Sequence, residues 1–111
     1  MEIHKNETAA WVTLAIQGDV DLATSPELRG QLEHILLSKK RPLALDLSGV
    51  THMDSSGIAV LIEGFRWAKR IQVPFVLLSP SPQVRMILEL AKLEEFFDIR
   101  DHLDDQIPEG L

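Results

Sequence analysis

The first part of the chain alternates apolar and polar residues, whereas the rest shows helical spacing between short apolar runs. Residues 10–17 predict a half-buried strand, because every second side chain is apolar. A shorter strand is expected at 2–5, with a turn at residues 6–8 between the two. The segment 18–21 is expected to end the second strand and to begin a loop.

A helix is expected to follow this loop. Two N-terminal caps fit the sequence equally well. In one, Ser25 is the N-cap and Pro26 occupies the first helical position; in the other, Thr24 and Glu27 form a capping box. Apolar residues then recur on one side at helical spacing, and Pro42 prevents the helix from continuing.

The remaining pattern repeats strand and helix. The expected elements are a strand at 43–47, a loop at 48–53, a helix at 55–70, a strand at 73–78, a helix capped by 79–82 and a last short strand or docking segment at 96–99. This order predicts an α/β fold with a single mixed sheet of four or five strands and three to five helices. The sheet should be parallel in its core, with an antiparallel hairpin at its N-terminal edge. We expect one domain over 1–111, with an acidic tail at 101–111 that frays.

The composition of the chain argues against several kinds of site and partner. The 111 residues include no cysteine, which excludes disulfides, thiolate metal sites and a cysteine nucleophile. The net charge is −6, and no dense Lys/Arg stripe is present, so direct nucleic-acid binding is not expected. The longest unbroken apolar run, Ile58–Ile62, is far below the roughly 20 residues of a membrane span. No signal peptide is visible either, so we expect a cytoplasmic protein that does not insert into membranes.

One segment, Asp54-Ser55-Ser56-Gly57, stands between a predicted buried strand and a predicted helix. Asp54 or Ser55 can accept a hydrogen bond from the free N–H groups of the helix start. Gly57 lets another group approach the backbone closely. In open α/β sheets, ligands and partners meet the fold at the carboxyl ends of the strands and at the helix N-termini that follow. This segment is therefore the candidate functional site.

The same residues resemble a known family. Asp46–Val50, Met53–Ile58 and Leu61 are similar to the STAS domain (sulfate transporter and anti-sigma factor antagonist), most closely to the stand-alone bacterial anti-sigma factor antagonists. The loop 18–21 and the following Thr24 resemble a loop of the same family. The resemblance covers nearly the whole chain in element order, and it implies a STAS-like fold.

The resemblance also implies a mechanism of regulation. Ser55 maps onto the family's phosphoacceptor, and the bacterial antagonists act in partner switching to regulate transcription. The expected partner is an anti-sigma factor that is also a serine kinase of the GHKL type; phosphorylation would abolish binding, and a PP2C-like phosphatase would reset the protein. The kinase would bring ATP and Mg²⁺, so this chain needs no cofactor or metal. The presumed docking surface contains Asp21, Thr24, Asp54, Ser56 and Gly57.

A second apolar face on the helix at 55–70 is formed by Val60, Gly64 and Trp67. Two interpretations stay open. The helix can be wedged between the sheet and a neighbouring helix, which would bury this face. Alternatively, the face is a partner-docking strip beside Ser55, with Gly64 allowing close approach and Trp67 acting as an anchor.

The sequence leaves other classes of function open besides that of an anti-sigma factor antagonist. Stand-alone STAS domains also serve as MlaB-like cytoplasmic subunits of an ABC-type phospholipid transporter, where the partner is the transporter ATPase; Leu90–Leu93 is slightly similar to these. A third alternative is direct binding of a small ligand or nucleotide. An enzyme is least expected, because His52, Asp54 and Ser55 are not set in a nucleophile elbow and no P-loop is present.

Two departures from the family pattern concern local structure. His52 stands where an aromatic residue is common, next to the presumed phosphoacceptor. Ala91 and Lys92 replace a Ser-Gly pair that often ends the third helix. A residue other than glycine in a left-handed cap costs roughly 1 kcal/mol or more, so a strained helix end is expected there.

Overall fold

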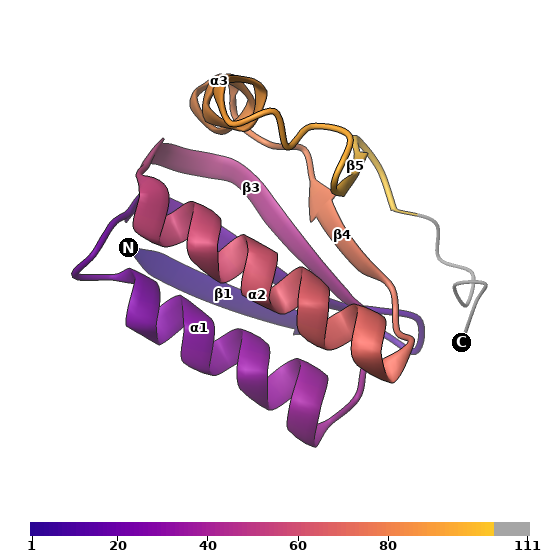
Figure 1. Cartoon of the computed structure of the whole chain (residues 1–111). Helices are drawn as coiled ribbons and strands as arrows, with labels where there is room; N and C mark the ends of the chain where they lie inside the picture. Colours follow the sequence, from indigo (N-terminus) through magenta and orange to yellow (C-terminus); the bar gives the residue numbers. More distant parts are fainter. Residues whose placement is uncertain (104–111) are drawn as a thin grey trace.

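The structure is a computed structural model that describes residues 1–103. Its five strands form one mixed sheet in the order β1-β2-β3-β4-β5 (Figure 1). The strands are β1 (Glu2–Glu7), β2 (Val12–Val20), β3 (Leu43–Met53), β4 (Phe75–Leu78) and β5 (Asp98–Arg100). The helical elements are α1 (Ser25–Glu33), the π-helix η1 (His34–Ser38), α2 (Ser55–Ile71) and α3 (Pro82–Leu90).

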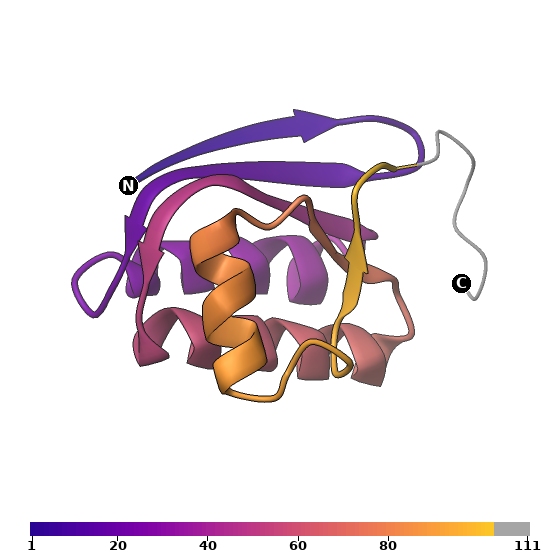
Figure 2. The same ribbon diagram turned by 90° about the horizontal axis from the view of Figure 1, so that it is seen from above.

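The strand pairing confirms the predicted α/β architecture. β1 pairs with β2 in antiparallel orientation, and each following neighbour in the sheet is parallel. The helices α1 and α2 lie side by side across one face of the sheet, and α3 packs on β3 (Figure 2). Because every parallel connection passes through helices, the carboxyl ends of β2 and β3 meet at one edge of the sheet.

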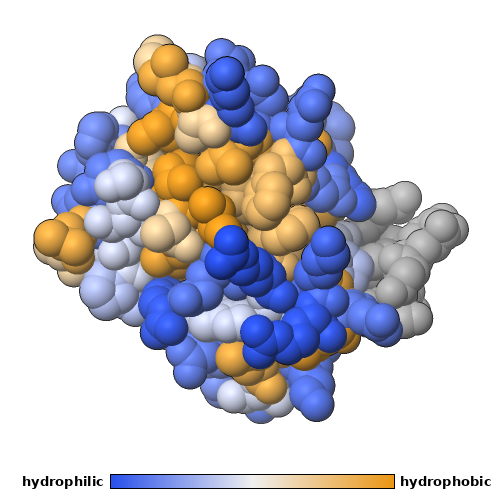
Figure 3. Space-filling view, viewed as in Figure 1, coloured by the Kyte–Doolittle hydropathy of each residue, from blue (hydrophilic) through white to orange (hydrophobic). Residues whose placement is uncertain are grey.

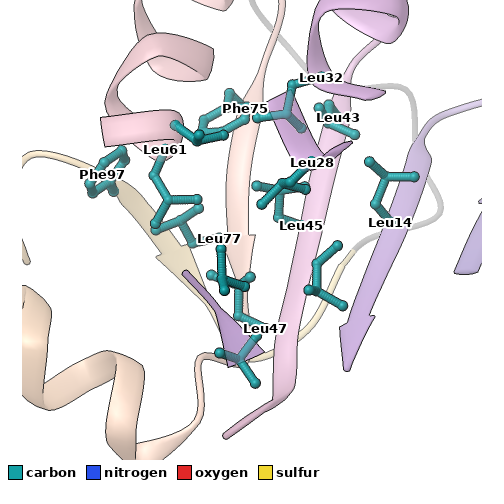
Figure 4. Close-up of a cluster of buried hydrophobic side chains, with 14 of the residues drawn as sticks. Leu14, Leu28, Leu32, Leu43, Leu45, Leu47, Leu61, Phe75, Leu77 and Phe97 are labelled. Atoms are coloured by element: carbon teal, nitrogen blue, oxygen red, sulfur yellow. The ribbon is translucent and has the colours of Figure 1, made fainter. Parts of the chain in front are cut away.

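The core lies between the sheet and the pair formed by α1 and α2. Leu14, Leu45 and Leu77 are register partners in β2, β3 and β4, so they form one row across the sheet. From the helices, Leu28 and Leu61 pack toward this row (Figure 4). All five side chains are fully buried, and each contributes about 1.5–3 kcal/mol through removal of apolar surface from water.

A smaller cluster covers the opposite face of the central strands. Ala44 of β3 and Val76 of β4 are fully buried there beneath Trp11. The guanidinium of Arg100 lies 5.9 Å from the centre of the Trp11 ring. The centre of β3 is therefore covered on both faces, as its continuous apolar run predicts.

Several strand ends differ from the sequence-based expectation. β1 runs to Glu7, through part of the turn expected at 6–8. β2 continues to Val20 rather than ending at residue 17, and the expected loop at 48–53 is the second half of β3. The register between β2 and β3 shifts between Ala15 and Gln17 and again between Gly18 and Asp19. Such bulges interrupt the alternation of inward and outward side chains, and so the period-two pattern does not reveal the full strands.

The segment after α3 forms both a short strand and a docking contact, the two alternatives expected for residues 96–99. Residues 98–100 form the short strand β5, and the ring of Phe96 packs on Phe65 of α2 with centroids 4.4 Å apart. Lys92 adopts a left-handed conformation with φ 58°, so the strained cap expected after α3 is present. In the expected tail, residues 101–103 are not helical, and the rest lies outside the described residues.

Gly64 of α2 packs closely against α1 and β4, and so it has no room for a side chain. A Cβ atom there would lie 3.0 Å from Leu32 Cδ1 and 3.1 Å from the Phe75 ring, whereas a Cβ at Gly30 of α1 would meet nothing within 4 Å. We expect Gly64→Leu to lower the free energy of unfolding by about 1–3 kcal/mol through overpacking. The matched control Gly30→Leu should raise it by up to about 1 kcal/mol through helix propensity. Urea unfolding measures both, and equal effects of the two variants would contradict this packing.

Candidate functional site

The parallel pairing of β2 and β3 builds the candidate site. Val20 and Met53, the last residues of the two strands, are register partners. The backbone N–H of Asp54 then donates to the carbonyl of Val20 over 3.2 Å. The loop that follows β2 and the first turn of α2 therefore lie next to each other, at the edge where an α/β sheet meets its partners.

The loop after β2 is held by its own side chains. The carboxylate of Asp21 accepts hydrogen bonds from the backbone N–H groups of Ala23 (3.0 Å) and Thr24 (3.1 Å). The Thr24 hydroxyl accepts from the N–H of Asp21 and donates to the carbonyl of Asp19. Thr24 occupies the N-cap position of α1, but its side chain makes no capping bond to the helix. Thr24 rather than Ser25 is therefore the N-cap residue, but the expected capping box with Glu27 does not form, because the hydroxyl of Thr24 closes the loop instead.

The hydrogen bonds that Asp21 accepts within this loop lower its pKa. Hydrogen bonds from the backbone and the side chain of Thr24 hold the pKa of Asp21 below its ordinary value of 3.8, with a smaller contribution from the Ala23 N–H. Each of these donors favours the charged carboxylate over the protonated acid. The loop therefore presents a fixed negative charge beside the start of α2.

Asp54 caps α2. Its backbone is extended, and its carboxylate accepts from the N–H groups of Ser56 (2.9 Å) and Gly57 (3.4 Å). A Cβ atom at Gly57 would lie 2.5 Å from Met53 Cγ and 3.0 Å from Val20 Cγ1. The close approach expected at Gly57 is thus made by the protein's own core, which seats the first turn of the helix on the ends of β2 and β3.

Ser55 is the first residue of α2, and its side chain is exposed. Its hydroxyl has no hydrogen-bond partner in the part of the chain that the structure describes. Ser56, the other hydroxyl of the pair, is only partly exposed. Ser55 thus presents an accessible nucleophilic oxygen whose modification breaks no bond of the fold.

Two residues of the suggested docking strip lie inside the protein. Val60 is 6% exposed, and Gly64 is buried against α1 and β4. Trp67 is half-buried, and the guanidinium of Arg29 from α1 lies 5.4 Å from the centre of its ring. The helix is wedged between the sheet and α1 at this face. A partner does not reach Val60 or Gly64, so they are removed from the docking surface.

Three exposed apolar residues near the site were not identified from the sequence. Leu22, beside Asp21, is 77% exposed, and Met86 and Leu90 of α3 are 61% and 77% exposed. Figure 3 shows hydrophobic side chains around α3 and at the loop after β2. The i, i+4 spacing of Met86 and Leu90, off the inward face of α3, is the signal that could have revealed them.

Met86 and Leu90 border a groove between α3 and the end of β3. The groove has a volume of about 240 Å³ and is lined by His52, Met53, Gln83, Met86, Ile87 and Leu90. It includes His52 and Met53 at the end of β3, the two residues that precede Asp54. The start of α2 therefore adjoins the Asp21 loop through the bond between Asp54 and Val20, and the groove through Met53.

Residues 1–103 contain neither a cluster of metal ligands nor a helix that could span a membrane. No three side chains among the histidines, aspartates and glutamates of this range come together as metal ligands. Within the same range, every helix is too short or too polar to cross a bilayer.

The family model of the STAS domain matches residues 1–106, and the chain therefore belongs to the STAS domain family. It is 26% identical over 101 residues to the anti-sigma-B factor antagonist of Listeria monocytogenes, covering 91% of this chain and 88% of that protein. A crystal structure of a putative anti-sigma factor antagonist from Thermotoga maritima superposes with a TM-score of 0.82 at 20% identity, over 91% of this chain and 87% of that one. The Bacillus cell fate determinant SpoIIAA in its phosphorylated form superposes with a TM-score of 0.71 at 18% identity, over 88% and 90% of the two chains.

The geometry at the start of α2 separates a stabilising side chain from a dispensable one. We expect Asp54→Ala to lower the free energy of unfolding by about 0.5–2 kcal/mol, because two helix N–H groups lose their acceptor. Ser55→Ala should change it by less than about 0.5 kcal/mol, since the hydroxyl bonds to nothing in the fold. Chemical denaturation compares the two. A larger loss for Ser55→Ala would show that Ser55 is the structural cap.

The lowered pKa of Asp21 sets a direction for the pH dependence of stability. The folded-state pKa lies below 3.8, so the ionised carboxylate contributes stability above that pH and loses it as the pH falls toward the folded-state pKa. We expect Asp21→Asn to melt at a lower temperature than the wild type by a constant margin between about pH 5 and pH 7. The margin should shrink below about pH 4. Thermal melts followed by circular dichroism test this, and a margin that grows with acidity would contradict it.

Proposed function

We propose that this protein is an anti-sigma factor antagonist, a regulatory module without catalytic activity of its own. It binds an anti-sigma factor that is a serine kinase and releases it when Ser55 is phosphorylated. The observation that carries the proposal is the exposed, unbonded hydroxyl of Ser55 at the first position of α2, in a chain of the STAS family. The named function of the Listeria relative, and the phosphorylated form in which Bacillus SpoIIAA is known, support it.

The charges around Ser55 favour regulation at the surface rather than through unfolding. A phosphate adds about −1.5 to −2 charges at neutral pH. The N–H groups of Ser56 and Gly57, which would otherwise bind it, already donate to Asp54. The positive end of the α2 dipole partly offsets the new charge. Phosphorylation therefore adds a strong negative charge beside Asp54 and Asp21 without removing any bond that holds the fold.

The docking surface that we propose differs from the one expected from the sequence alone. It keeps Asp21, Thr24, Asp54, Ser55 and Ser56, which lie at the β2–β3 edge. Gly57 serves it indirectly by seating the helix start. The additional members are Leu22, Met86 and Leu90. Large exposed apolar side chains mark protein–protein contacts, and these three would add apolar contact area for a partner that docks at Ser55.

The kinase partner supplies the reactive components. The terminal phosphoryl group of ATP passes to the Ser55 oxygen, the bond to the bridging oxygen breaks and ADP leaves, and the hydroxyl proton goes to a base on the kinase. ATP and Mg²⁺ come with the kinase. The chain acts only as the protein substrate. A PP2C-like phosphatase would hydrolyse the phosphoserine and restore the binding form.

The test uses candidate GHKL-type serine kinases, purified and incubated with the full chain, ATP and Mg²⁺. Mass spectrometry should place one phosphate on Ser55, and Ser55→Ala should abolish it while the neighbouring control Ser56→Ala does not. The phosphorylated chain and Ser55→Asp should bind the kinase at least about tenfold more weakly than the wild type. Circular dichroism and heteronuclear spectra of the phosphorylated form should stay native-like.

Other results of these experiments would refute the switch at Ser55 or favour a different function. Phosphate on a different residue, or equal affinity of wild type and Ser55→Asp, would refute the proposed switch. Specific binding of the wild-type chain to an ABC transporter ATPase, with no kinase binding, would favour the MlaB-like subunit instead. Calorimetry with nucleotides alone separates both from a ligand-binding module, for which the chain by itself would give a saturable signal.

A further inference from the structure

One face of α2 is uncovered along most of the helix. Its residues recur once per turn, at i, i+4, i+7, i+11 and i+15, and so share one side. We call this face the α2 ridge, and it consists of Ser55, Ala59, Ile62, Arg66 and Arg70. Ile62 is partly buried, and the other four residues are exposed. The ridge starts at the candidate phosphoacceptor and ends at two arginines.

The ridge contains a shallow depression. Its volume is about 500 Å³, and it is lined by Ala59, Ile62, Glu63, Arg66, Trp67 and Arg70. The half nearer Ser55 is small and apolar. The far half holds Trp67 and the two arginines, together with Glu63, whose carboxylate pairs with Arg29 of α1. Figure 3 shows strongly hydrophilic side chains gathered over the face on which α1 and α2 lie.

The two arginines of the ridge differ from the others in the chain. The sequence holds six arginines. Four have bonding partners in the fold, namely Arg29, Arg41, Arg85 and Arg100. Arg66 and Arg70 have neither an ion pair nor a hydrogen bond among residues 1–103. Two adjacent, unpaired guanidinium groups on a chain of net charge −6 form a local cationic site that complements an acidic surface.

We propose that the α2 ridge binds an acidic helix of the same anti-sigma factor, with carboxylates of that helix paired to Arg66 and Arg70. The inference rests on the proposed function and specifies the partner's chemistry. Arg66 and Arg70 lie one turn apart, about 6 Å along the axis, which matches two Asp or Glu residues one turn apart on a partner helix. A guanidinium binds a carboxylate with two parallel hydrogen bonds, so the pairing fixes orientation as well as charge.

The ridge also explains why a phosphate at its other end would release such a partner. From Ser55 to Arg70 the helix rises about 22 Å, the length of a partner helix of about four turns. An acidic helix lying on the ridge is attracted at Arg66 and Arg70. Close to Ser55 it meets a neutral hydroxyl near the carboxylates of Asp54 and Asp21, and phosphorylation adds a dianion to these charges. Like charges brought together in a contact weaken binding strongly, and so an acidic partner makes the switch act in the required direction.

The test measures the affinity of the full chain for the serine kinase that phosphorylates Ser55, by calorimetry at two salt concentrations. Arg66→Glu/Arg70→Glu should weaken binding at least about tenfold and reduce its salt dependence. The control Lys5→Glu/Lys39→Glu makes the same change in net charge on other elements, and it should alter affinity by less than about threefold. The neutral pair Arg66→Gln/Arg70→Gln should weaken binding less than the glutamates do, and it covers the case in which the glutamate variant fails to fold.

The outcomes separate this inference from the proposed function. If Ser55→Asp loses binding while Arg66→Glu/Arg70→Glu and the glutamine pair keep it, the ridge inference is wrong and the switch at Ser55 stands. If no serine kinase binds the wild type, both are refuted together. Rescue of Arg66→Glu/Arg70→Glu by exchanging two carboxylates of the kinase for lysines would confirm the pairing. Equal losses of affinity in Arg66→Glu/Arg70→Glu and in Lys5→Glu/Lys39→Glu would mean that only net charge matters, which overturns the inference.

Discussion

The whole candidate site depends on the parallel pairing of β2 with β3. Because Val20 and Met53 are register partners, the segments that follow them begin at the same edge of the sheet. The hydrogen bond from the Asp54 N–H to the Val20 carbonyl fixes that junction. Residues more than thirty positions apart in sequence thereby form one surface, with the Asp21 loop on one side and the start of α2 on the other.

The inner face of α2 packs closely against the sheet and α1. Gly57 and Gly64 lack side chains where the helix approaches the sheet and α1, which lets α2 lie close to both. The apolar side of the helix is used in folding, and the outer side is left for contacts with other molecules. A 17-residue helix thus carries its structural residues on one face and the residues that we propose for recognition on the other.

The sequence predicted the fold class well because its strongest signals are local. The alternation in β2, the helical spacing in α1 and α2, and the continuous apolar run of β3 each correspond to an observed element. The second half of β3 was missed because its pairing with β2 is irregular, and no local pattern records a bulge.

The site was predicted in part. The capping role of Asp54 is one of the two alternatives that the sequence left open. Val60 and Gly64 could not be assigned to the interior, because a helix with two apolar faces looks the same whether its second face meets α1 or a partner. The exposed Leu22 and Met86 were overlooked for a related reason: an apolar residue gives no sign of exposure until the packing around it is known.

The unbonded hydroxyl of Ser55 has a consequence for the lifetime of the protein in the cell. Because the oxygen contributes no hydrogen bond to the fold, the phosphorylation that we propose would remove no contact that protects the chain from proteolysis, which acts mainly on opened chains. A cell could then hold a reserve of inactive molecules and recover them by dephosphorylation, with no new synthesis. The speed of a response would be set by enzymes acting on one exposed atom, and not by translation.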